Sequence, residues 1–227
     1  CLVATDGTTV IDQFSFEEQR PDVSYGRYPD GSDDLRYMAI PTPGAANVSV
    51  YEGIAEPVQF SRQGCLCSAP VTVSLSTETP DAIIYYTTDG TNPYSVARER
   101  PAGDVYTEPI LVSSTMTIQA VAWRPGWRQS DVRGQRYSFV GRNLRDFRSP
   151  LPLMIVDTMG KTVGGSQVPS YGYVIDTDEQ GLARLTGQTD FAGRAALNVR
   201  GKSSEGFAKR QYHFEVWDQD DRDRAAS

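Results

Sequence analysis

The chain has 227 residues, of which 39% are hydrophobic and 22% charged, as in an ordinary globular protein with room for one or two cores. Asp and Glu outnumber Lys and Arg by 29 to 22, and the formal net charge of −7 excludes the basic footprint of a nucleic-acid-binding protein. No apolar run approaches the ~20 residues of a membrane span, so we expect neither a membrane span nor a signal peptide within these residues.

The first part of the chain is rich in turns and poor in strands. One strand is expected at residues 10–16, and turn-forming pairs then recur through residues 20–47, with Tyr25, Tyr28 and Tyr37 between them. So few strands cannot build a β-sandwich. We therefore expect residues 1–47 to be the end of a domain that begins further upstream.

The middle of the chain alternates with the two-residue period of β-strands. Strands are expected at residues 71–77, 83–88, 115–123 and 133–140, each bounded by Gly, Pro or Ser. Their spacing predicts an all-β sandwich over residues 56–140. The best helical stretch, residues 143–148, is too short to be stable alone.

A third unit is expected from residue 150 to residue 227. A polar connector precedes it, and four more strands are expected at residues 151–157, 171–177, 194–200 and 211–217. In the last of these, Tyr212, Phe214 and Val216 share one face, which we expect to point into the core. The predicted chain is thus mainly β.

The three cysteines leave several pairings open. Cys65 and Cys67 could close a small ring, or one of them could pair with Cys1. Three thiols without a nearby histidine make a poor zinc site, so a structural or free state is favoured over a metal or redox role.

Positive residues surround a glycine-containing loop near the end of the chain. Gly201 and Gly206 let the backbone approach a ligand closely, and Arg200, Lys209 and Arg210 surround them with charge. Kinases hold ATP phosphates with a positive strand residue beside such a loop. A plain hairpin turn with the Lys-Arg pair in solvent is the other interpretation, and spacing alone favours it.

Other motifs are weaker. Trp123 and Trp127 could form a surface on which a sugar stacks, although core and turn packing is the more common use of such residues. The aspartates of residues 218–223 lack the glycine and closing glutamate of a calcium loop, so a solvated turn is favoured and no metal site is predicted. Asn47 begins a glycosylation sequon, a tripeptide that often occurs by chance.

Three resemblances to known families follow the chain order. Residues 1–47 resemble the closing segment of a lamin-tail domain, an immunoglobulin-like (Ig-like) sandwich; the runs that carry this are SYGR at 24–27, DG at 30–31 and PTPGAAN at 41–47. Residues 58–139 resemble the chitobiase/β-hexosaminidase C-terminal type of Ig-like domain; the runs that carry this are FSRQG at 60–64, IYYTTDG at 84–90, NP at 92–93, Tyr106, PI at 109–110 and IQAVA at 118–122.

The third resemblance is to the beginning of a CotH domain, found in secreted or spore-coat proteins with an atypical kinase fold. It rests on LP at 151–152, VRG at 199–201, Ser203, Ser204, Phe207, KR at 209–210, Tyr212 and EV at 215–216. The family usually has Pro at the position of Ala208 and a second Lys at that of Arg210. The fold implied for residues 150–227 is the β-rich first portion of an α+β kinase-like domain.

The CotH resemblance implies a nucleotide site and a parent enzyme. Lys209 would be the nucleotide lysine and Arg200, Gly201, Ser203 and Ser204 the neighbouring phosphate loop, with ATP and Mg²⁺ as cofactors of the parent protein. The catalytic carboxylates of the family lie in a later part, so no catalysis is expected from this chain.

The resemblances together imply an extracellular or cell-surface protein of several domains, with spacer or adhesion modules. Its partner would be a protein substrate or a cell-surface polysaccharide. The alternative is a non-catalytic carbohydrate-binding, cell-wall-binding or structural module.

Overall fold

The computed structural model describes residues 1–16, 19, 23–201 and 209–218, and these residues contain strands and short 3₁₀ turns but no α-helix. The mainly β fold class is therefore confirmed. No helix in these ranges is long and apolar enough to cross a membrane. The chain forms two compact units: residues 1–54 with 124–128, and residues 55–123 with 129–227.

The described residues of the first unit contain five short strands. Two of them form an antiparallel hairpin, β1 (Leu2–Val3) with β2 (Val10–Asp12). The other three form a small sheet in the order β3 (Tyr25–Arg27), β4 (Leu35–Met38) and β5 (Val50–Tyr51). Strand β2 ends before residue 16 because its partner β1 offers only two residues to pair with. Residues 124–128 join this unit through the hydrogen bonds of Glu52 N–H to Gly126 O and of Arg128 N–H to Gly53 O, at 2.9 and 3.0 Å.

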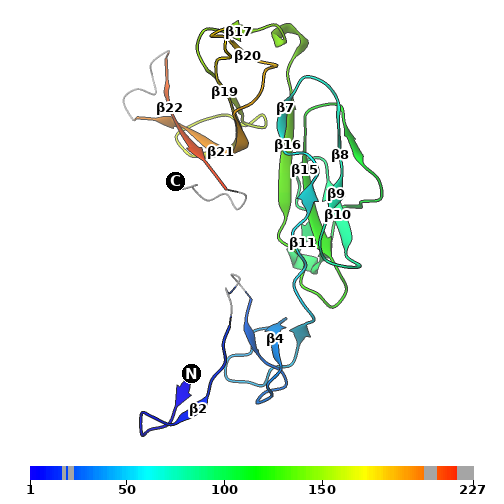
Figure 1. Cartoon of the computed structure of the whole chain (residues 1–227), viewed down its shortest axis with the longest axis vertical. Helices are drawn as coiled ribbons and strands as arrows, with labels where there is room; N and C mark the ends of the chain where they lie inside the picture. The colour runs from blue at the N-terminus through cyan, green and yellow to red at the C-terminus, as the bar shows by residue number, and fades with distance from the viewer. Residues whose placement is uncertain (17–18, 20–22, 202–208, 219–227) are drawn as a thin grey trace. The chain divides into compact units, whose positions relative to one another are not determined.

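The second unit begins with a β-sandwich whose larger layer is a five-stranded sheet (Figure 1). Its order is β13 (Asp104–Val105), β10 (Ile83–Thr87), β15 (Met116–Trp123), β16 (Arg133–Phe139) and β7 (Cys65–Cys67). All neighbours are antiparallel except β16 and β7, which run parallel. Strands β10, β15 and β16 lie within one residue of the predicted bounds.

The facing layer consists of two strand pairs. These are β6 (Gln59–Phe60) with β9 (Leu75–Ser76), and β8 (Val71–Val73) with β14 (Ile110–Val112). The strand predicted at residues 71–77 is thus two strands. It divides at Ser74, which exchanges hydrogen bonds with Ser61, so that the chain leaves β14 and joins β6.

The core of the sandwich lies between these layers. Val73, Leu75 and Val112 from the facing pairs pack with Ile118, Ala120 and Tyr137 from the five-stranded sheet, and all six are buried. Burial of each large apolar side chain stabilises the fold by about 1.5–3 kcal/mol. The segment between β10 and β13 forms a minor strand pair, β11 (Tyr94–Ser95) with β12 (Arg100–Pro101). The 3₁₀ turn η1 (Val96–Arg98) connects these two strands.

A connector leads from the sandwich to the C-terminal sheet. The helical stretch considered at 143–148 is only the 3₁₀ turn η2 (Arg142–Leu144), followed by β17 (Arg148–Ser149), which pairs with β20 (Ala183–Arg184). The sheet itself has the order β18 (Leu153–Asp157), β19 (Val168–Ile175), β21 (Phe191–Arg200) and β22 (Gln211–Val216), all antiparallel (Figure 1).

Strand β18 begins two residues later than predicted, and β19 and β21 begin three residues earlier; two further differences have a clear physical reason. Strand β19 ends at Ile175 rather than at residue 177, because the N–H of Asp176 donates to the Asp190 carboxylate at 2.7 Å and leaves the ladder. Tyr212 does not face a core: its exposed fraction is 52%, whereas Phe214 and Val216 on the same face are half-buried. The start of β22 is therefore exposed, and only its second half is partly buried.

Candidate functional site

Strand β16 separates the core of the sandwich from a second, polar surface. Tyr137 points into the sandwich and is buried in its core, and Gln135 is buried where it bonds to Gln63 and Gly64. The alternate residues Gly134, Arg136 and Ser138 point outward, as the two-residue period of a strand requires. These outward residues meet the C-terminal sheet, so the candidate site is the junction between sandwich and sheet.

Asp157, the last residue of β18, is the centre of this junction. Its Oδ2 accepts hydrogen bonds from Arg136 Nε at 2.9 Å and from Ser138 Oγ at 2.6 Å, and Arg136 Nη2 lies 2.9 Å from the same oxygen. Its Oδ1 accepts the N–H of Met159 at 2.9 Å. The Ser138 hydroxyl also lies 2.9 Å from the Tyr173 hydroxyl. We call Arg136, Ser138, Asp157 and Tyr173 the junction network.

Electrostatics favour the ionised form of Asp157. Burial raises the pKa of the carboxyl, but the hydrogen bonds from Ser138 and Arg136 and the Arg136 charge outweigh burial and hold the pKa below its ordinary value. Only 14% of the Arg136 side chain and 19% of the Asp157 side chain are exposed, so this ion pair is well shielded from water. Burial raises the pKa of Tyr173 to about 12, so its hydroxyl stays protonated and can donate.

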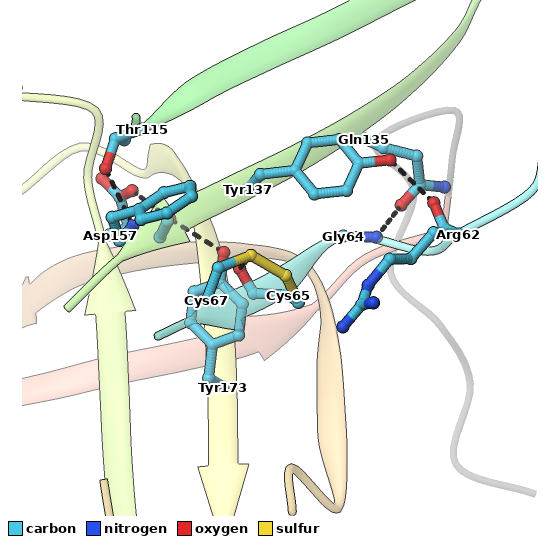
Figure 2. Close-up of a disulfide and its surroundings, with 11 residues drawn as sticks. Arg62, Gly64, Cys65, Cys67, Thr115, Gln135, Tyr137, Asp157 and Tyr173 are labelled. Carbon is cyan, nitrogen blue, oxygen red and sulfur yellow. Dashed lines mark hydrogen bonds between the residues drawn. A yellow bond between two sulfur atoms is a disulfide. The ribbon is translucent and has the colours of Figure 1, made fainter. Parts of the chain in front are cut away.

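A disulfide lies on the strand next to the junction network. Cys65 and Cys67 are bonded to each other, which answers the question that the sequence left open, and Cys1 is free and exposed. Both cysteines lie on β7, opposite Tyr137 and Phe139 of β16. Figure 2 shows the disulfide beside the buried Tyr137, whose hydroxyl donates to the carbonyl oxygen of Arg62 at 2.7 Å.

The predicted nucleotide residues are only partly described. Arg200 ends β21 and pairs with Gln211 at the start of β22, so Arg200 and Lys209 lie near the ends of the two arms of one hairpin; both are exposed. Gly201 has a φ of +88°, a conformation that glycine adopts readily. Ser203 and Ser204 lie outside the described residues, so the proposed phosphate loop stays a prediction.

The predicted sugar residues, Trp123 and Trp127, belong to different units. Trp123 ends β15, and its ring meets that of Tyr85 edge-on at a centroid distance of 6.4 Å. The Trp127 ring packs on Gly53, where an added Cβ would lie 2.6 Å from the ring, and Arg124 lies over it at 4.7 Å. A sugar-binding role for either tryptophan stays a prediction.

Two weaker motifs can also be placed. The Asn47 side chain donates to Arg27 O at 2.9 Å and accepts from the Thr42 hydroxyl at 2.7 Å, so it is engaged in holding a turn. The described residues contain no group of three or more His, Cys, Asp or Glu side chains placed to hold a metal ion. Of the acidic run at 218–223, only Asp218 is described.

Comparison with known proteins concerns the sandwich. Residues 63–133 match the family model of the chitobiase/beta-hexosaminidase C-terminal domain. The middle of the chain is such a domain. The match lies within the sandwich of β6 to β16, and the resemblance expected there is confirmed. It does not extend to the lamin-tail and CotH resemblances, which stay predictions. No curated protein and no solved structure matches the chain.

Sequence reasoning missed the junction network. Arg136, Ser138 and Asp157 belong to no motif, and their roles depend on which outward residues of the chitobiase-type domain meet the next sheet. One signal was available: polar residues at alternate positions of a strand that is otherwise buried point to a polar partner on its outer face.

Proposed function

We propose that the chitobiase-type domain is a rigid spacer in an exported or cell-surface protein, and that it holds the C-terminal sheet in a fixed orientation. The observation that carries this proposal is the junction network, in which a shielded ion pair and two hydroxyl groups join the two sides. Charge-assisted hydrogen bonds of this kind are directional, so they fix an orientation as well as adding stability.

Export is supported by the disulfide and by the domain type. Disulfides form in oxidising compartments and are rare in the cytosol. The Cys65–Cys67 bond is therefore the chemistry expected of a protein outside the cell.

Removal of the central carboxylate tests the spacer role. Asp157→Ala removes the carboxylate that pairs with Arg136 and leaves that guanidinium only its bond to the Thr117 hydroxyl, which should cost about 2 kcal/mol and free the sheet from the sandwich. We expect the second unit to unfold in one thermal transition in the wild type and in two transitions in Asp157→Ala, with residual dipolar couplings of the variant reporting two independent orientations. Asp104→Ala, at an exposed position of β13, is the control. Unchanged couplings in Asp157→Ala would refute the proposal.

The C-terminal sheet is the second part of the proposal. We propose that residues 150–227 are the nucleotide-binding portion of a CotH-type kinase-like domain that uses ATP and Mg²⁺, acting on a protein partner. What favours this is the hairpin that ends in Arg200 and Lys209, a positive pair at one end of a sheet. The first 47 residues would then be the end of a lamin-tail domain.

Titration of the chain with ATP–Mg²⁺ tests the nucleotide proposal. Lys209→Ala should weaken binding by about tenfold, because one phosphate contact of a charged group is lost. Lys161→Ala, an exposed lysine in another loop, should bind as the wild type does. Equal affinities in calorimetry for all three proteins would contradict the assignment of Lys209, and no phosphoryl transfer is expected from any of them.

A further inference from the structure

A cleft of about 380 Å³ opens within the second unit, between the chitobiase-type domain and the C-terminal sheet. Gly134 and Gln135 at the start of β16, with Gln63, form one wall. The other wall comes from β19, β21 and the two residues that follow β22. This volume is within the usual range of small-molecule sites, and the cleft contains none of the predicted site residues.

Aromatic rings define the sheet side of the cleft. Tyr171, Phe191 and Trp217 all line it. The guanidinium of Arg194 lies over the Tyr171 ring at 5.6 Å and donates to the Tyr171 hydroxyl at 3.2 Å. Three aromatic side chains and a guanidinium therefore line the same cleft.

Trp217 is held through both its backbone and its indole ring. The backbone N–H of Trp217 donates to Arg194 O of β21 at 2.9 Å, and the indole Nε1–H donates to Glu215 Oε2 at 3.3 Å. Gln167 donates to the same carboxylate oxygen at 2.7 Å, which fixes Glu215 in turn. A ring fixed in this way loses little side-chain entropy when a ligand stacks on it.

The polar side chains of the cleft are placed to form hydrogen bonds with the hydroxyl groups of a ligand. Gln135 donates to Gln63 at 2.9 Å and accepts the N–H of Gly64 at 2.7 Å, so the two amides are oriented before any ligand arrives. Arg194 and Asp218 contribute one positive and one negative charge. The lining therefore carries no net charge, which disfavours a phosphate and suits a neutral ligand.

We infer that this cleft binds a sugar ring of a neutral saccharide, whose C–H face stacks on Trp217 and whose hydroxyls bond to Gln63, Gln135 and Asp218. Apolar ring faces with hydroxyl edges match aromatic walls with a few convergent polar groups. Two other hollows among the described residues fit less well. One has a volume of about 470 Å³ and a single aromatic residue, Phe60, in its lining; the other, of about 250 Å³, is lined by three aspartates and no aromatic ring.

Calorimetric titration of the whole chain tests this inference. The probes are the tetrasaccharides of β-1,4-linked glucose, β-1,4-linked N-acetylglucosamine and β-1,4-linked mannose, with tetragalacturonate as the acidic probe. We expect at least one neutral tetrasaccharide to bind at millimolar concentration. Trp217→Ala should weaken that binding by about tenfold or more, as loss of an aromatic anchor does.

Two further variants keep the test independent of folding. Gln63→Ala changes an exposed loop residue and should also weaken binding while the melting temperature stays unchanged. Tyr212→Ala changes an exposed aromatic residue of β22 outside the cleft and should bind as the wild type does. The inference fails if no neutral probe binds, if only tetragalacturonate binds, or if Tyr212→Ala abolishes binding and Trp217→Ala does not.

Discussion

Gly64 is a position at which one added carbon would disturb the chitobiase-type domain. A Cβ there would lie 2.4 Å from the carbonyl oxygen of Arg136, and the Gly64 N–H donates to Gln135 at 2.7 Å. Gly64→Ala must therefore move the loop away from β16 and lose that bond. We expect a loss of about 2 kcal/mol in the free energy of unfolding, measured with urea.

Gly164 is the matched control for this substitution. A Cβ added there meets no atom within 4 Å, so Gly164→Ala should change the free energy of unfolding by less than about 0.5 kcal/mol. Equal losses in the free energy of unfolding for the two variants would show that the close contact at Gly64 does not exclude a larger side chain.

Asp157 makes the stability of the second unit depend on pH. Its pKa is lower in the folded protein than in the unfolded chain, so its stabilising contribution is complete above the ordinary carboxyl range and is lost as the pH falls through the lower, folded value. Wild type should lose more stability than Asp157→Asn between pH 5 and about pH 2. Urea titrations of both proteins measure this, and parallel curves would contradict it.

At the scale of the strand, hydrophobic alternation is enough to predict most of the second unit. Strands β10, β15 and β16 are long and strongly patterned, and each of them follows the predicted bounds closely. The failures occur where a strand changes partner or leaves its ladder, as at Ser74 and Asp176. Those events depend on side-chain hydrogen bonds with residues distant in sequence, Ser61 and Asp190, which no local pattern contains.

The candidate site was less predictable than the strands. Motif reasoning selects residues with known chemistry, such as Lys209 and Trp127, whereas Asp157 and Arg136 gain their roles from contact between two modules. The disulfide was one of several pairings that the spacing allowed. The cleft residue Trp217 belongs to no motif at all and is found only once β21 and β22 are paired.

The Cys65–Cys67 disulfide closes a very short loop on the edge strand β7. Because the chain entropy that a cross-link removes grows with loop length, this bond should contribute only about 1–2 kcal/mol. Reduction with a phosphine should therefore lower the melting temperature by a few degrees without unfolding the domain. The experiment is best done in Cys1→Ser, where no free thiol can exchange. Complete unfolding on reduction would contradict this prediction.

At the scale of the second unit, the junction network and the cleft are two consequences of one packing arrangement. The outward face of β16 supplies Arg136 and Ser138 to the network, and Gly134, four residues before Ser138, to the cleft. A spacer that fixes the sheet therefore also fixes the two walls of the proposed sugar site. Orientation and binding should be coupled although no residue takes part in both.

This coupling gives a last prediction. Asp157→Ala changes no residue of the cleft, yet it should weaken saccharide binding several-fold, because the free chain must first reassemble the two walls. Trp217→Ala should weaken binding while retaining the single thermal transition. If Asp157→Ala divides the thermal transition but binds saccharide with wild-type affinity, the junction network fixes the sheet and the saccharide binds elsewhere. If Asp157→Ala binds saccharide weakly but keeps the wild-type transition and orientation, the proposed spacer role is wrong.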